Sequence, residues 1–214
     1  MSADVWRQLL RTDPHAYRAR VLFFSRTDWH ALREHRVSLS LEEFILHLEA
    51  LFQPEGLGPG DRFEMSLWWG EEQPHYTLHV RGQDGMRRPE SVGNVGATHR
   101  RAVSRWVKDT TRRRQMDPWQ VHVGAPPPYR PPQELLDACL AEFPDTRVTS
   151  LTVQRFEGIH APGFSVEPGA RIEASLEALD GGIIQVFLGE WTEEDSLRLE
   201  EWAQVARSGY AQGP

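Results

Sequence analysis

Apolar residues recur at helical spacing in several stretches of the chain. The clearest case is residues 41–53, where the apolar positions follow a period of three to four, which predicts an amphipathic helix. Its inward positions are Leu41, Phe44, Ile45, Leu48 and Phe52. Ser40 and Glu43 fit a capping box, in which each side chain binds the backbone amide of the other. Similar spacing predicts helices over 4–10, 97–115, 132–143 and 192–206.

Alternation of apolar and polar residues predicts strands in other segments. Residues 62–69 and 75–81 alternate on both sides of a turn at 70–74, which predicts a hairpin. Residues 171–178 and 183–188 predict a second hairpin around an Asp-Gly-Gly turn. Further strands are expected over 18–25, 119–123 and 148–156, a long loop is expected over 82–96, and residues 28–35 fit neither pattern.

These elements predict an α+β protein with a mainly antiparallel sheet built from hairpins and with four or more amphipathic helices. A helix, a hairpin and a helix occur in this order on both sides of a proline-rich segment. That order would suit two similar α/β halves, although no residue-level repeat accompanies it. We divide the chain into an N-terminal α/β part at 1–124, a proline-rich connection at 125–132, a C-terminal α/β part at 133–208 and a flexible tail at 209–214. The five prolines of the connection lock φ and predict an extended surface segment, with the two parts packed as one unit.

The composition is that of an ordinary globular protein. The chain of 214 residues is 39% hydrophobic and 26% charged and contains eight Trp and nine Phe, so it can bury a core. No stretch approaches the roughly 20 apolar residues of a membrane span, and the first residues lack the basic and apolar regions of a signal peptide. The single Cys139 cannot form an internal disulfide. We therefore expect a cytoplasmic protein without membrane association.

Nine histidines raise the question of a metal site, but their spacing does not support one. His75 and His79 lie four apart on a predicted strand, about 13 Å from each other. His30 and His35 are five apart, whereas two ligands on one helix face need a separation of three or four. His47 opens an H-x-E sequence without the cysteines that a zinc deaminase needs. We predict solvated surface histidines in each case, and no metal or cofactor.

Nucleophilic catalysis has no recognisable motif in the sequence either. A G-x-S-x-G elbow is missing from it. Cys139 lies on the apolar stripe of its predicted helix, where burial raises the pKa of a thiol and makes it inert. Neighbouring glutamates fall in the first turns of helices or in hairpin loops, where they stabilise helix dipoles or solubilise turns. We assign no catalytic residue.

Charge is unevenly distributed along the chain, whose net charge is −7. Residues 81–116 contain ten Lys and Arg against three Asp and Glu, and residues 134–201 contain four against fifteen. Within the predicted helix 97–115, four basic residues follow a spacing of i, i+4, i+7 and i+11, which gives one row about 16 Å long on the outer face. This basic row consists of Arg101, Arg105, Lys108 and Arg112, and we expect Arg113 and Arg114 to extend it.

The basic row is the candidate binding site. Charge polarity, aromatic content and the missing catalytic motifs favour a non-enzymatic binding protein that acts through protein–protein contact, with inhibitors and immunity proteins as examples. The first alternative is a nucleic-acid-binding protein that uses the basic face of helix 97–115 to contact phosphates. Because 23 of the 24 basic residues are Arg, as a GC-rich coding sequence produces, Arg is weaker evidence for phosphate recognition here. The second alternative is an enzyme whose site is assembled from scattered residues.

Overall fold

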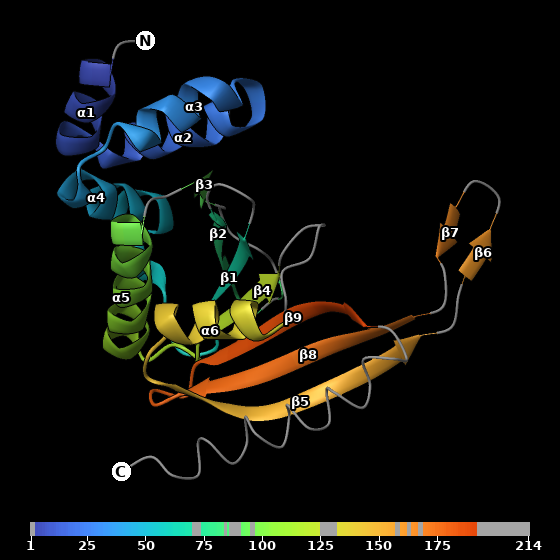
Figure 1. Ribbon diagram of the computed structural model, residues 1–214. Coiled ribbons are helices and arrows are strands. Elements are labelled where there is room, and N and C mark those ends of the chain that lie inside the picture. Colours follow the sequence, from blue (N-terminus) through green and yellow to red (C-terminus); the bar gives the residue numbers. More distant parts are fainter. Residues whose placement is uncertain are drawn as a thin grey trace. The chain divides into compact units, whose positions relative to one another are not determined.

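The computed structural model describes residues 3–69, 74–83, 85, 91–94, 97–124, 132–156, 159–161, 164–166 and 169–191 (Figure 1). The chain divides into two compact units, residues 1–119 and 120–214, which we call unit 1 and unit 2 and describe separately. The described residues form six α-helices and nine strands. No helix among them combines the length and the apolar character that crossing a membrane requires.

Unit 1 begins with four helices joined by short turns. They are α1 (Ala3–Thr12), α2 (Pro14–Thr27), α3 (Trp29–Val37) and α4 (Leu41–Phe52). The side chain of Asp13 accepts a hydrogen bond from the amide of Ala16 at the start of α2. Asp28 does the same for the amide of Ala31 at the start of α3. Each aspartate pairs an amide that the first turn of its helix leaves without a partner, so three helices follow one another with little intervening chain.

The strand predicted over 18–25 is wrong, because these residues belong to α2. Their apolar run resembles a buried strand, but burial follows a helical period rather than alternation. Tyr17 and Val21, four residues apart, are almost fully buried, whereas Phe23 is 61% exposed. Asp13 and Pro14 supply the start of the helix, since proline suits the first helical position. Of residues 28–35, which fit neither pattern, Asp28 caps α3 and the remaining residues form most of this helix.

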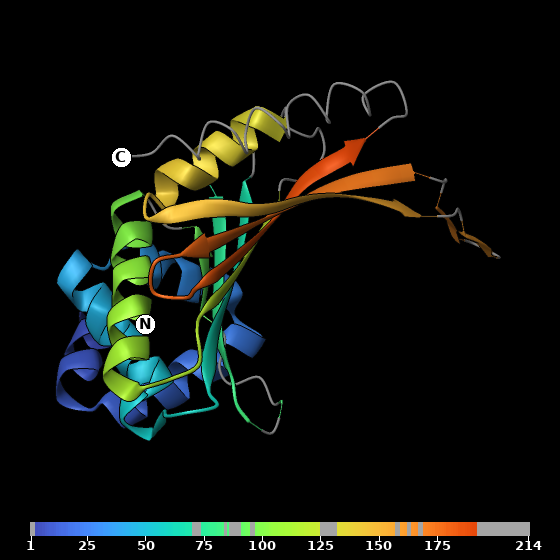
Figure 2. The same ribbon diagram turned by 90° about the horizontal axis from the view of Figure 1, so that it is seen from below.

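Three antiparallel strands of unit 1 pair in the order β3-β2-β1. They are β1 (Arg62–Trp69), β2 (Pro74–Arg81) and β3 (Ser91–Asn94), and β3 lies inside the predicted loop 82–96. In the register of β1 and β2, Phe63 is opposite Val80 and Glu64 is opposite His79. Helices α4 and α5 (Ala97–Arg114) lie on the same side of β1 and β2 in both views (Figures 1 and 2). One face of these strands is therefore covered by helices.

Aromatic side chains join this covered face to the helices. The rings of Phe52 in α4 and Phe63 in β1 lie 5.9 Å apart, and the rings of Phe63 and Trp106 in α5 lie 5.3 Å apart. Both pairs meet edge to face, an arrangement that aromatic rings favour. Met65 and Leu67 follow Phe63 at alternate positions of β1 and are equally buried. A short 3-10 helix, η1 (Pro54–Gly56), follows α4.

Four strands of unit 2 pair in the order β4-β9-β8-β5. Strand β4 is parallel to β9, and the other neighbours are antiparallel. The elements are β4 (Gln120–Gly124), α6 (Pro132–Glu142), β5 (Thr146–Phe156), β8 (Gly169–Ala178) and β9 (Ile183–Trp191), and β6 (Ile159–Ala161) pairs separately with β7 (Phe164–Val166). Helix α6 packs against β9. Its buried side chains are Leu135, Leu136 and Cys139, and Phe143 is buried directly after it.

The α+β class is confirmed, with mostly antiparallel strands. The helices predicted over 4–10, 41–53, 97–115 and 132–143 are present as α1, α4, α5 and α6. Residues 125–131 of the proline-rich connection, the predicted helix 192–206 and the tail lie outside the described residues. The two similar halves stay a prediction.

Ser40 and Glu43 form the capping box predicted for α4. Ser40 Oγ accepts a hydrogen bond from the Glu43 amide at 3.2 Å, and the Ser40 amide donates to Glu43 Oε2 at 3.0 Å. We expect Ser40→Ala to lower the free energy of unfolding by about 1 kcal/mol, because it leaves a helix amide unpaired. Urea denaturation measures this loss. Ser40→Asp, which can still cap the helix, should stay close to the wild type, and an equal loss in both variants would contradict the capping role.

Candidate functional site

The four residues of the basic row all lie on α5. The side chains of Arg101, Arg105 and Arg112 are exposed. Lys108 is half-buried, and its Nζ lies 5.4 Å from the centroid of the Trp119 ring, close enough for a cation–π contact. The row therefore presents three exposed guanidinium groups and one ammonium group that packs on an aromatic ring of its own unit.

The basic row ends at Arg112. This residue pairs with Asp109 on the same helix at 3.1 Å, and both side chains are exposed, at 84% and 60%. Such a pair contributes little, because water screens it. Arg113 and Arg114, which we expected to extend the row, pair instead with carboxylates of α4 and η1 at 3.7 and 4.0 Å. These pairs are also partly exposed and contribute little, but they direct the two guanidinium groups toward α4 and η1.

The opposite side of α5 fixes the helix in unit 1. The residues on this side are Val103, Trp106, Val107 and Thr110, which recur at helical spacing and are buried. The indole Nε1 of Trp106 donates a hydrogen bond to Glu49 of α4 at 2.7 Å. Hydrogen bonds to a charged acceptor are stronger than neutral ones. This contact opposes rotation of α5 and so sets the direction in which the basic row faces.

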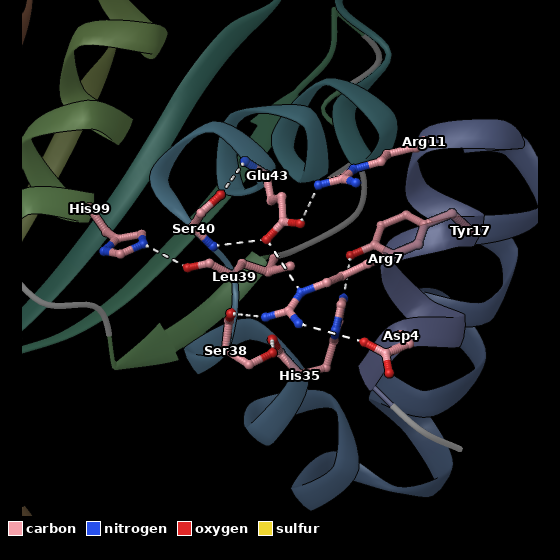
Figure 3. A network of polar contacts seen from close by, with 10 residues as sticks. All are labelled: Asp4, Arg7, Arg11, Tyr17, His35, Ser38, Leu39, Ser40, Glu43 and His99. Carbon is pink, nitrogen blue, oxygen red and sulfur yellow. Dashed lines mark hydrogen bonds and ion pairs between the residues drawn. The ribbon is translucent and has the colours of Figure 1, made fainter.

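The start of α5 is held at the turn that precedes α4 (Figure 3). His99 Nε2 lies 3.3 Å from the carbonyl oxygen of Leu39, and the His99 ring meets the Phe44 ring edge-on at 5.1 Å. A ring nitrogen that binds a carbonyl oxygen must carry a proton, so His99 is the donor. Helix α5 is thus attached to α4 and its preceding turn at two separate points along its length.

The carboxylate of Glu43 joins α1 to the start of α4 (Figure 3). Its Oε1 lies 2.8 Å from Arg11, and its Oε2 lies 3.4 Å from Nε of Arg7. Arg7 also donates a hydrogen bond to the carbonyl of Ser38 at 2.6 Å. The hydrogen bond from the Ser40 backbone lowers the pKa of Glu43, and the charges of Arg7 and Arg11 add to this against the opposing effect of burial. The carboxyl is therefore ionised at neutral pH.

Three buried rings connect α2, α3 and α4. The hydroxyl of Tyr17 lies 2.9 Å from His35 Nε2 and 2.7 Å from His47 Nδ1. Burial, followed by the charge of Arg36, lowers the pKa of His35 to about 4 and lowers the pKa of His47 well below its usual value. Burial also raises the pKa of Tyr17. The predicted surface positions of His35 and His47 are wrong, because these rings serve as hydrogen-bond partners inside a helix cluster.

A second polar cluster lies on the face of β1 and β2 that is opposite the helices. His79 Nε2 lies 2.8 Å from Glu64 Oε2, and Arg62 and Arg81 lie 3.1 and 2.5 Å from Oε1. Burial raises the pKa of Glu64, but hydrogen bonds from His79, Arg81 and Arg62 outweigh it and lower the pKa to about 2. His79 is buried too, contrary to its predicted surface position, because it faces this carboxylate.

Metal binding and thiol chemistry find no support among the residues that the structure describes. Within these residues, His, Cys, Asp and Glu side chains nowhere gather in groups of three that could hold an ion. Cys139 is buried on α6, where burial and then the charge of Glu142 raise the pKa of the thiol to about 12. A thiol with this pKa is protonated at neutral pH and is a poor nucleophile.

Comparison with known proteins gives no family for the chain. No protein-family model matches the sequence, and neither a curated protein nor a solved structure matches it.

The two buried polar clusters are absent from our sequence-based predictions. Glu64 and His79 lie on the polar faces of two predicted neighbouring strands. The register of the hairpin, which sets them opposite each other, could have predicted their contact. Tyr17 is separated from His35 and His47 by 18 and 30 residues on different helices. The periodic pattern of a sequence does not predict hydrogen bonds between side chains of different helices.

The low pKa of Glu64 predicts how stability depends on pH. Its pKa is about 2 in the folded protein against an unperturbed 4.5, so the carboxylate stabilises the fold above pH 4.5 and loses this contribution as the pH falls toward 2. We expect the difference in unfolding free energy between the wild type and Glu64→Gln to shrink between pH 4.5 and pH 3. Urea denaturation across this range measures it, with Glu134→Gln, at an exposed carboxylate, as the control for net charge. A difference that is unchanged at pH 3 would be inconsistent with this assignment.

Proposed function

We propose that the protein is a non-enzymatic binding protein that docks an acidic surface of another protein through the basic row of α5. One observation carries this proposal. Trp106 and His99 fix the helix on its inner side and at its start, whereas Arg101, Arg105 and Arg112 remain exposed. A helix that is already fixed loses little conformational entropy on binding, and Arg is enriched at protein interfaces. An inhibitor or immunity protein is the specific type that we propose.

An acidic protein surface suits the basic row better than nucleic acid does. Residues 1–119 contain 18 Lys and Arg against 16 Asp and Glu, so unit 1 lacks the large positive excess of a nucleic-acid-binding domain. Arg113 and Arg114 pair with carboxylates of the same unit, which shortens the row further. A short row of fixed charges fits an acidic patch, where charge complementarity determines orientation and association rate. We further propose a cytoplasmic location, because a single cysteine permits no internal disulfide.

Charge reversal in the basic row tests this proposal. We expect Arg105→Glu/Arg112→Glu to lose capture of the protein partner from extracts of the source cells, and to bind the purified partner at least tenfold more weakly. The control, Arg20→Glu/Arg147→Glu, makes the same change in net charge at exposed arginines of α2 and β5 and should bind like the wild type. The melting temperature of the basic-row variant should barely move, since exposed charge changes usually cost less than about 0.5 kcal/mol. The control also removes the exposed pair of Arg147 with Glu177, so its melting temperature is measured alongside its binding.

The salt dependence of binding separates the two kinds of partner. A protein partner gives a shallow dependence that lies mainly in the association rate. A nucleic-acid partner would give capture that is lost on nuclease treatment and an affinity that falls steeply with salt. Each lost phosphate contact would then lower the slope of that salt dependence by about one. This result would replace the protein partner by nucleic acid. Wild-type binding by the reversal variant would remove the basic row as a site.

A further inference from the structure

Each of the first four helices contributes a ring to one buried cluster. Tyr17 of α2 lies between His35 of α3 and His47 of α4, and its contact with His35 is visible in Figure 3. The indole of Trp6 in α1 stacks on the His35 ring with 4.8 Å between the centroids. None of these four side chains is more than 4% exposed. We call the three hydrogen-bonded side chains of His35, Tyr17 and His47 the histidine clasp.

The hydrogen bonds of the histidine clasp leave no acceptor for an additional proton. The Tyr17 hydroxyl has one proton, so it donates to one imidazole and accepts an N–H from the other. The second ring nitrogens, His35 Nδ1 and His47 Nε2, are buried and make no hydrogen bond to any residue that the structure describes. Protonation would create a charged N–H donor without an acceptor at a buried position, which is costly.

The nearest charges also oppose protonation. Arg36 of α3 and Arg7 of α1 both lower the pKa of His35, and Arg36 lowers that of His47. Glu43 of α4 acts in the opposite direction on His35. Its two oxygens are already shared with the Ser40 amide and with arginines of α1. Little negative charge is therefore left to stabilise an imidazolium.

Four other described ionisable groups near these helices make their contacts outside the histidine clasp. Asp4 and Arg11 of α1 engage Arg7 and Glu43, respectively. Arg18 of α2 donates a hydrogen bond to the carbonyl of Leu51. On α5, His99 faces Phe44, and strand β3, which contacts α3, has no ionisable residue.

We propose that the histidine clasp is acid-sensitive: proton uptake by His35 and His47 releases α1–α3 from α4, while α4 stays packed on α5, β1 and β2. The retained part has its own apolar contacts among Phe52, Phe63 and Trp106, none of which involves the clasp. Local release of a subset of helices is possible because proteins open in cooperative segments of unequal stability. The inference is independent of the basic row and of its partner.

The pH range of the release follows from the two histidines. The pKa of His35 falls from 6.5 to about 4 in the folded protein, and the pKa of His47 is lowered well below 6.5. Release returns both groups toward their ordinary value, so opening takes up protons and becomes easier as the pH falls from 6.5 toward 4. The pKa of Glu43 is lowered as well, so its pairs with Arg7 and Arg11 persist in this range. The side chains of Arg7 and Arg11 are 34% and 63% exposed, so water weakens these pairs on the arginine side even though the carboxylate itself is buried.

Hydrogen exchange of the full chain between pH 7 and pH 4.5 tests the proposal, after correction for the intrinsic pH dependence of exchange. We expect the opening constant of α1–α3 to rise about tenfold per pH unit for each histidine below pH 6.5, while amides of α5 and β1 keep their protection. His35→Gln should remove one of these factors of about ten. His30→Gln replaces an exposed histidine of the same helix and should keep the wild-type slope.

Three results would overturn the proposal: an opening constant of α1–α3 that does not change with pH, loss of protection in α1–α3 and α5 together, or a wild-type slope in His35→Gln. If that variant does not fold, proton NMR of the wild-type chain decides the question. The ring signals of His35 and His47 should stay those of neutral imidazole down to pH 5. Titration of either ring near pH 6.5 would also overturn the proposal.

Discussion

Glu43 closes the first turn of α4 and, with the same two oxygens, holds Arg7 and Arg11 of α1. A negative charge at this position also interacts favourably with the helix dipole, so one carboxylate satisfies an amide, a dipole and two cations. Further along α4, His47 binds Tyr17 and Glu49 binds the indole of α5. A rotation of α4 would break its contacts with α1, α2 and α5 together. The arrangement of unit 1 therefore depends on how this helix begins.

Unit 1 separates the charges that stabilise it from the charges that it exposes. Glu43 and Glu64 are almost fully buried beneath the cations that they bind. Arg105 and Arg112 are exposed, and the pair that Arg112 makes lies on its own helix. Because exposed charges contribute little to folding, the composition of the basic row can change without loss of the fold. The residues of such a surface can therefore be selected for binding a partner, because the stability of the fold does not require them.

The features that we predicted correctly have local causes. Ser40 and Glu43 are three residues apart, so the start of α4 is legible in the sequence, and the buried stripe of α5 follows from its period. The apolar run of α2 gave a wrong prediction, because four consecutive apolar residues fit a strand or a helix equally and the capping by Asp13 lay outside the run. The buried histidines could not be predicted, since their partners come from other helices. The length of the basic row could not be predicted for the same reason, because the carboxylates that pair with Arg113 and Arg114 are brought close to them only by the fold.

The strand order of unit 2 has a consequence for how this unit is made. Strand β9 lies between β4 and β8, although it is the last of these strands to be synthesised. Its parallel pairing with β4 joins Gln120 to Ile183 across the whole of the intervening chain. Contacts between residues so distant in sequence form slowly, because the loop between them must close first. When synthesis has reached β8, the edges of β4 and β8 that will pair with β9 are therefore still unpaired. A chain truncated before β9 would leave both edges open to pairing with other strands.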